Sequence, residues 1–165
     1  MSNNAKLPAK RGKTEDTVVG GNQDFVTMTI ADQLFGIPVL QVQDVLGHQR
    51  ITRIPLAPPE VAGSLNLRGR IVTAIDVRLR LGLTGRPKNK PEMSIVVDLR
   101  GELYSLIVDS VGEVLSLSNE DFERNPATLD HRWREVSTGI YRLNNQLMVV
   151  LDVSRLLNFA NLEAA

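Results

Sequence analysis

The chain has 165 residues, 42% of them hydrophobic, which is enough to fill the core of one ordinary domain or two very small ones. Lysine plus arginine and aspartate plus glutamate each number 19, so the formal net charge is zero, which argues against a nucleic-acid partner and against a membrane surface held by charge. There is no cysteine, no apolar run of about 20 residues and no secretion signal, so we expect a cytoplasmic protein without disulfides or membrane insertion.

The two ends of the chain differ in composition from its middle. Residues 1–23 are rich in lysine, asparagine, glycine and threonine and contain few large apolar side chains. Ordering such a segment costs entropy that little burial would offset. We therefore expect a flexible N-terminal arm over residues 1–23, a folded domain over residues 24–159 and a short tail over residues 160–165.

A β-hairpin pattern opens the folded part. From Phe25, apolar and polar residues alternate, turn at Asp32-Gln33 and resume as a second apolar run. After Pro38 the spacing of Val42, Val45 and Leu46 predicts a helical turn ended by a glycine. The whole pattern returns without a gap 69 positions later, so that the segment starting at Phe25 lies over the segment starting at Ser94.

A second pair of segments repeats in the same way. The segment that starts at Gly63 lies over the segment that starts at Gly139, 76 positions later. Asp76 then falls on Asp152, and the turn Arg68-Gly69 falls on Asn144-Asn145. Two copies of one small β unit are the simplest explanation.

Each copy contains a hairpin, a helical turn, a short strand (ITRI in the first copy, LSL in the second), a second hairpin and a short closing helix. Sheets this short are marginal alone, so we expect the strands to curl into small barrels that pack together. The sequence predicts an all-β fold of two pseudo-symmetric five-stranded lobes with short helices. We place lobe 1 at about residues 24–83 and lobe 2 at about residues 92–159, with room for the lobes to intertwine, and the Gly- and Pro-rich segment 82–91 marks their boundary.

No catalytic constellation is apparent. His48 and His131 stand in predicted connections without a second ligand at metal-binding spacing, and phosphate-binding glycine motifs are absent. Asp76 and Asp152 could suggest paired-carboxylate catalysis, but each stands between a strand and a helical pattern, where an aspartate caps the helix. We favour the capping role and predict no enzymatic activity, no cofactor and no metal.

The segment NLRGRIVTAIDVR, residues 66–78, resembles the signature of the chemotaxis coupling (CheW-like) family. The likeness extends to VLQVQDVLG, LIVDSVGEVLSLS and LMVVLDVSRLL, and so covers nearly all of residues 24–159. One departure is Thr73, where the family often has proline. The resemblance implies two SH3-like β-barrels that form a non-enzymatic adaptor. Such adaptors join the cytoplasmic tips of methyl-accepting chemoreceptors to the regulatory domain of a histidine kinase, within membrane-associated receptor arrays.

The resemblance also implies two binding surfaces. A receptor helix is expected in an apolar groove between the lobes, and the positions that match its contacts are Val39, Val42, Val45 and Val111. Contact with the kinase is expected mainly from the first lobe, at the positions Ile51, Ile54, Pro55 and Ile71. Helix-in-groove recognition of this kind uses an apolar stripe on the partner helix.

Arg68 is assigned to the receptor-binding set as a hypothesis. Gly69 allows a tight turn that lets the guanidinium of Arg68 reach a carboxylate, either Asp44 of the same lobe or one on a partner. The alternative is an exposed hairpin arginine of little energetic consequence, which is our interpretation of Arg70.

Two other functions are weighed against this one. The chain could be a CheW-like scaffold of a non-flagellar chemosensory pathway. More remotely, it could be a small-barrel nucleic-acid-binding protein, which would need a basic face.

Overall fold

The computed structural model of the chain describes residues 21–83 and 91–159. Residues 1–20 of the expected arm, residues 84–90 of the expected connector and the tail 160–165 lie outside the described residues. The first strand, β2, begins at Asn22, so the last two residues of the expected arm belong to a sheet.

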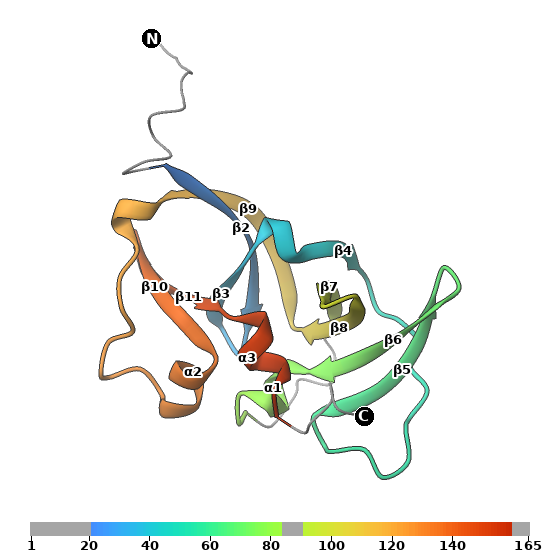
Figure 1. The fold of residues 1–165 in the computed structure, drawn as a ribbon. Helices are drawn as coiled ribbons and strands as arrows, with labels where there is room; N and C mark the ends of the chain where they lie inside the picture. The colour runs from blue at the N-terminus through green and yellow to red at the C-terminus, as the bar shows by residue number, and fades with distance from the viewer. Residues whose placement is uncertain (1–20, 84–90, 160–165) are drawn as a thin grey trace.

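Short strands dominate the described part of the chain (Figure 1). In chain order the elements are β2 (Asn22–Ile30), β3 (Gln33–Pro38), the 3-10 turn η3 (Val39–Gln41), β4 (Val42–Leu46), β5 (Val61–Leu67), β6 (Arg70–Asp76), α1 (Val77–Arg80), β7 (Met93–Leu99), β8 (Glu102–Val108), β9 (Ser110–Ser118), the 3-10 turn η4 (Asn119–Asp121), α2 (His131–Glu135), β10 (Ser137–Leu143), β11 (Gln146–Leu151) and α3 (Val153–Leu157).

The strands form two five-stranded sheets. The order in one sheet, here called sheet I, is β10-β11-β3-β2-β9, and the order in the other, sheet II, is β4-β7-β8-β6-β5. The prediction of an all-β fold with two five-stranded lobes and short helices is confirmed. In Figure 1 the strands β10 and β11 lie at one end of the molecule and β5 and β6 at the other, with α1 and α3 between them.

The duplication and the sheets are related by strand exchange. If each strand of sheet I is replaced by its repeat partner, the order becomes β5-β6-β8-β7-β4, which is sheet II. The chain passes from sheet I to sheet II after β3, and back again after β8. Each sequence copy, residues 24–83 and residues 92–159, therefore gives strands to both sheets instead of forming one lobe alone.

The helical turn predicted at Val42, Val45 and Leu46 is wrong, because these residues form strand β4. The register against β7 shifts between Val42 and Asp44, which marks a β-bulge. Along β4 the side chains of Val42, Asp44 and Leu46 are half-buried and those of Gln43 and Val45 are exposed, as in an ordinary strand, and the exposed valine Val45 produced the three-residue spacing that imitated a helix. The helical turn in this part of the chain is η3, just before β4.

Two smaller expectations also need correction. The first hairpin turns at Ala31 and Asp32, whose φ angles are +51° and +67°, one residue earlier than predicted. Of the expected strand ITRI, only Thr52 pairs, in an isolated bridge to Ser64, and LSL lies inside the longer strand β9.

Three apolar clusters form the interior. A shared core packs residues of both sheets together, including Met28 and Phe35 from sheet I and Ile75 and Leu106 from sheet II. Each lobe also has its own smaller cluster. In sheet II this cluster is Leu65, Val72, Ala74, Val96, Leu103 and Ile107, and in sheet I it is Phe25, Tyr141, Met148 and Val150.

Both lobes are closed in the same way. The bridge Thr52–Ser64 joins the segment after β4 to β5, and the bridge Glu123–Ile140 joins the segment after β9 to β10. Ser64 and Ile140 are repeat partners, and the residue before each is a glycine. A Cβ atom on Gly63 would collide with the carbonyl oxygen of Thr52, and a Cβ atom on Gly139 would lie 2.5 Å from the carbonyl oxygen of Glu123. Glycine is therefore required where the closing segment approaches the strand.

Candidate partner-binding surfaces

The valines expected to face a receptor lie on η3 and on two edge strands. Val39 and Val42 on the β4 side and Val111 on β9 are half-buried and all pack against the shared core, whereas Val45 is 39% exposed. Since β4 is an edge of sheet II and β9 an edge of sheet I, Val42 and Val111 come from different sheets. We call Val39, Val42, Val45 and Val111 the valine surface.

Two exposed apolar residues beside the valine surface were missed by the sequence reasoning. Val114 on β9 is 55% exposed, and it is the repeat partner of Val45, so the duplication itself could have indicated it. Leu40 is 91% exposed between Val39 and the start of β4. No sequence signal marks it, because a leucine within an apolar run is usually buried.

The β5–β6 turn positions Arg68. Arg68 and Gly69 have φ angles of +52° and +86°, and the Asn66 Oδ1 accepts a hydrogen bond of 2.9 Å from the Gly69 N–H. Arg68 Nη2 lies 3.0 Å from Asp44 Oδ2, so of the two carboxylates considered, the one within the chain is engaged. The Arg68 side chain is 75% exposed, so the pair contributes less than about 1 kcal/mol and leaves the guanidinium accessible.

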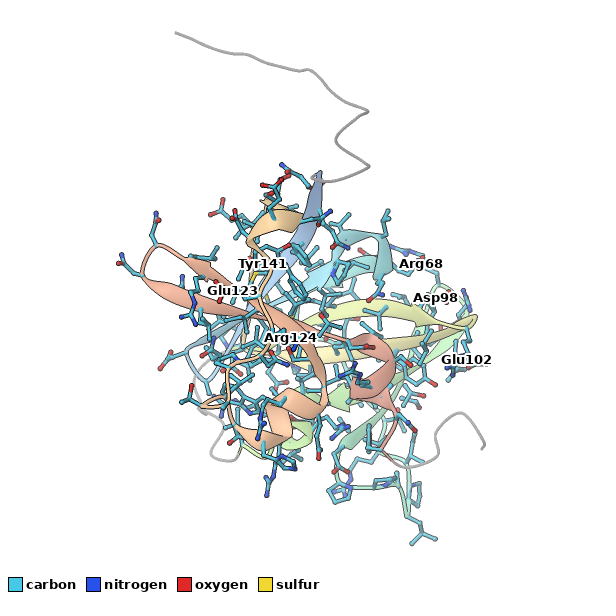
Figure 2. The ribbon with its side chains drawn as sticks, turned by 60° about the vertical axis from the view of Figure 1, so that its left-hand side comes forward. Arg68, Asp98, Glu102, Glu123, Arg124 and Tyr141 are labelled. Atoms are coloured by element: carbon cyan, nitrogen blue, oxygen red, sulfur yellow. The ribbon has the colours of Figure 1, made fainter. Side chains whose placement is uncertain are left out.

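A second arginine-glycine turn lies beside the first. Arg100 and Gly101, between β7 and β8, have φ angles of +54° and +86°, and Asp98 Oδ1 accepts the Gly101 N–H at 2.9 Å. Arg70 Nη2 donates a hydrogen bond of 3.1 Å to the Gly101 carbonyl, so Arg70 ties the two turns together and is more than an exposed hairpin arginine. Figure 2 shows Arg68 and Asp98 at the same end of the molecule, with Glu102 close by.

The residues expected to face a kinase lie toward the other edge of sheet II. Ile71 on β6 is 69% exposed, Ile54 is 40% exposed, and Pro55 is also exposed. Ile51 is half-buried against the interior cluster of this lobe. We call Ile51, Ile54, Pro55 and Ile71 the isoleucine surface. Leu56, which the sequence reasoning did not select, is fully exposed beside Pro55 and has a φ angle of +65°.

The duplicated aspartates are bound to the backbone. Asp76 Oδ1 accepts a hydrogen bond of 3.2 Å from the Leu79 N–H at the start of α1. Asp152 Oδ1 accepts one of 3.2 Å from the Arg155 N–H at the start of α3. Each carboxylate therefore serves as a helix cap.

A buried ion pair crosses between the lobes. Arg78 on α1 places Nε 3.0 Å from Asp109 Oδ1 and Nη2 2.8 Å from Asp109 Oδ2. The hydrogen bond to Asp109 raises the pKa of Arg78, against the opposing effect of burial. Sequence reasoning missed the pair, because the repeat partners of these two residues, Ser154 and Leu40, carry no charge.

A cavity of about 380 Å³ lies in sheet I, lined by Phe25, Phe122 and Tyr141 among others. The rings of Phe25 and Tyr141 meet edge to face at 5.4 Å. Burial raises the pKa of Tyr141, and the charge of Asp121 adds to this effect. In Figure 2, Tyr141 lies near Glu123 and Arg124, away from the Arg68 end.

Within residues 21–83 and 91–159, no group of three or more histidine, aspartate or glutamate side chains could hold a metal ion. None of the helices in those ranges is long and apolar enough to cross a membrane.

The chain is similar in sequence to known proteins. The profile of the CheW-like domain matches residues 24–161. The chain is 31% identical over 136 residues to the chemotaxis protein CheW of Klebsiella aerogenes, covering 82% of each chain. It is 28% identical to CheW of Helicobacter pylori, covering 95% of this chain and 98% of that one.

A solved structure is also similar. The crystal structure of the scaffolding protein TtCheW from Thermoanaerobacter tengcongensis matches with a TM-score of 0.75 and 29% identity, over 83% of this chain and 93% of that one. The chain thus shares sequence with all three proteins and three-dimensional arrangement with TtCheW. The chain belongs to the CheW-like domain family.

Proposed function

We propose that this chain is an adaptor of bacterial chemotaxis signalling, which couples methyl-accepting chemoreceptors to a chemotaxis histidine kinase. In this proposal the valine surface and Arg68 bind the cytoplasmic tip of a receptor. The isoleucine surface binds the regulatory domain of the kinase. The protein acts on the cytoplasmic side of the membrane, at receptor arrays.

The placement of the two apolar surfaces at separate edges of the molecule carries the proposal. The strand order β4-β7-β8-β6-β5 puts the valines of β4 at one edge, and Ile71 lies on β6 near the other edge. Thr52 pairs with Ser64 of β5, so the segment with Ile51 and Ile54 runs along that far edge. Exposed apolar side chains that gather in one patch, unlike single scattered ones, are typical of protein-binding surfaces.

The valine surface suits an apolar helix. Val42 and Val111 come from two different sheets that share one core, so a helix lying across them would contact both lobes. Arg68 beside β4 offers a largely exposed guanidinium to a carboxylate on that helix, at the cost of a weak pair with Asp44.

The proposal assigns no chemical step to the chain. The carboxylates that the duplication singles out, Asp76 and Asp152, are occupied as helix caps. Coupling then depends on holding two partners in one geometry. Modest affinity at each surface is sufficient when many receptors and kinases are joined in an array.

Single-surface variants test the proposal. The native chain is mixed separately with a receptor cytoplasmic fragment and with the kinase regulatory domain from the same genome, and Kd is measured by calorimetry. We expect Val42→Glu to weaken receptor binding by at least about tenfold and to keep kinase binding, and Ile71→Glu to do the reverse. Gln146→Glu, an exposed change on β11, is the matched control. Loss of both partners in either variant, or of neither, would contradict the assignment of separate surfaces.

A further inference from the structure

The Arg78–Asp109 ion pair is the most deeply placed charge contact that the structure describes between the lobes. The Arg78 side chain is only 8% exposed and the Asp109 side chain 20% exposed, and both oxygens of the carboxylate meet the guanidinium. Asp109 Oδ2 also accepts the Ala31 N–H at 2.8 Å, and the Asp109 N–H donates to the Thr29 carbonyl at 3.2 Å. The carboxylate therefore connects α1 to the β2–β3 hairpin of sheet I.

The position of the pair in the chain links the two proposed binding surfaces. Arg78 lies on α1, which follows β6 directly, and β6 carries Ile71 of the isoleucine surface. Asp109 stands at the crossover between β8 and β9, two residues before Val111 of the valine surface. The ion pair between Arg78 and Asp109 thus joins the start of β9 to the helix that follows β6.

The link is present on one side of the pseudo-symmetric molecule only. At the equivalent crossover, between β3 and β4, Leu40 replaces Asp109 and is exposed to solvent, and Ser154 replaces Arg78. The duplicated fold does not itself require an ion pair at this position.

Other polar contacts of α1 strengthen the same side. Arg80 donates hydrogen bonds of 2.7 Å to the Leu156 carbonyl and 3.0 Å to the Arg155 carbonyl, which join α1 to α3. Trp133 Nε1 donates to the Leu81 carbonyl at 3.2 Å. Figure 1 shows α1 and α3 side by side between the lobes. The pair therefore belongs to a polar seam on the helical side, opposite in character to the apolar valine surface.

We propose that Arg78 and Asp109 are positioning residues that hold the two sheets at a fixed angle, and that this fixed angle transmits the state of the receptor to the kinase. The inference rests on the proposed function and deepens it. Neither residue is assigned to a binding surface. Breaking the pair should therefore leave binding intact and reduce coupling.

The test variant is the double substitution Arg78→Met with Asp109→Asn. Removing one charge alone would leave the other buried without its partner, whereas the double change removes both, and the asparagine oxygen can still accept the Ala31 N–H. A second variant, Arg78→Lys, keeps the charge but loses the two-pronged geometry. The matched control is Arg142→Met with Glu123→Gln, an exposed pair with Nε and Oε1 3.0 Å apart at sheet I.

The first readout is the geometry of the lobes. Because the chain has no cysteine, Glu102→Cys on β8 and Gln146→Cys on β11 allow one spin label on each sheet. Pulsed electron resonance then gives the distance distribution between the labels. We expect a broader distribution in Arg78→Met/Asp109→Asn, an intermediate one in Arg78→Lys, and a native one in the control. A distribution of native width in the double variant would overturn the proposal.

The second readout separates coupling from binding. The receptor cytoplasmic fragment, the full-length kinase and each variant are assembled, and the rate of kinase autophosphorylation is measured beside the Kd for each separate partner. We expect Kd values within about twofold of native and a fall in receptor-dependent kinase activation of about tenfold. Native activation by the double variant, or a parallel loss of binding, would overturn the positioning role. If the native chain bound neither partner, the proposed function itself would fail. This outcome differs from a failure of the positioning role alone, in which the native chain still binds both partners.

Discussion

The two lobes share one backbone plan and fill it with different side chains. Inside sheet I the cluster is built on Phe25 and Tyr141, and a cavity of about 380 Å³ opens beside these rings. Inside sheet II the position of Tyr141 is taken by Leu65, within a cluster of aliphatic residues. The comparison separates the features that the fold requires from those that each lobe has acquired.

One pair of positions shows how the interiors diverged. In sheet I, Gly36 leaves room for Met148, whose Sδ would lie 2.8 Å from a Cβ at that glycine. In sheet II the equivalent positions are Ser105 and Val72, so the glycine is replaced by a larger residue and the methionine by a smaller one. The Ser105 hydroxyl is buried and has no hydrogen-bond partner among the described residues. The change in side-chain volume at one position is compensated at the other, as dense packing requires. The hydrogen-bonding capacity of the buried Ser105 hydroxyl is not compensated in this way.

The closure of the lobes did not diverge. Gly63 and Gly139 occupy equivalent positions and both admit a closing segment that a Cβ would block. The lobes therefore differ in their interiors and in their charged link, while the strand order and the closing bridges are the same.

Breaking the Arg78–Asp109 ion pair should have the largest effect on the free energy of unfolding. Arg78→Met removes the partner of a mostly buried carboxylate and should lower the free energy of unfolding by about 4 kcal/mol. At the equivalent position of the other copy, Ser154→Met should change it by less than about 0.5 kcal/mol. Urea denaturation followed by tryptophan fluorescence measures both. Equal losses at the two positions would mean that the lobes are linked symmetrically.

Substitution of the closing glycines Gly63 and Gly139 should lower the free energy of unfolding through both lobes. Gly63→Ala forces a Cβ against the Thr52 carbonyl at a φ of +152°, and we expect a loss of about 3 kcal/mol. Gly139→Ala meets the Glu123 carbonyl and should cost about 2 kcal/mol. Gly69→Ala, whose Cβ would enter open space, serves as the control and should cost about 1 kcal/mol. If the control lost as much as the closing glycines, close approach would not be the cause.

Ser105→Ala should stabilise the protein. Removing a buried hydroxyl without a partner relieves its desolvation penalty, so we expect the free energy of unfolding to rise by about 1 kcal/mol. The urea midpoint should increase at constant slope. A decrease would show that the hydroxyl makes a stabilising contact in solution.

High pH should destabilise the protein through Tyr141 of sheet I. Since burial raises the pKa of this phenol above the usual 10.0, unfolded chains ionise it at a lower pH than folded chains do. The associated stability is complete below pH 10.0 and is lost as the pH rises through the raised pKa. The difference in unfolding free energy between the native protein and Tyr141→Phe should therefore stay constant below pH 10 and change above it. Identical pH profiles would contradict the burial of the phenol.

Much of the architecture follows from the sequence, because the repeat is readable there. The offsets of 69 and 76 positions pair every strand of one sheet with a strand of the other, including β5 with β10 and β6 with β11. The exchange of strands is not readable, since alternating apolar residues show which side chains are buried but not which sheet buries them. In β4 an exposed valine, Val45, likewise gave a strand the apolar spacing of a helix.

The candidate surfaces were predictable to different degrees. The turn at Arg68-Gly69 is visible in the sequence, and its contact with Asp44 was one of two alternatives. The Arg78–Asp109 pair was not predictable, because its two residues are 31 positions apart and have uncharged repeat partners. Long-range contacts of this kind depend on the strand exchange and appear only in three dimensions.

We expect the chain to hold a receptor and a kinase at the same time, at two surfaces on one body. The most direct test is analytical ultracentrifugation of the native chain with both a receptor cytoplasmic fragment and a kinase regulatory domain. We expect a ternary complex that contains all three proteins. Val42→Glu should form a binary complex with the kinase domain alone, and Ile71→Glu a binary complex with the receptor fragment alone. Competition between receptor fragment and kinase domain for the chain, with no ternary species, would contradict it.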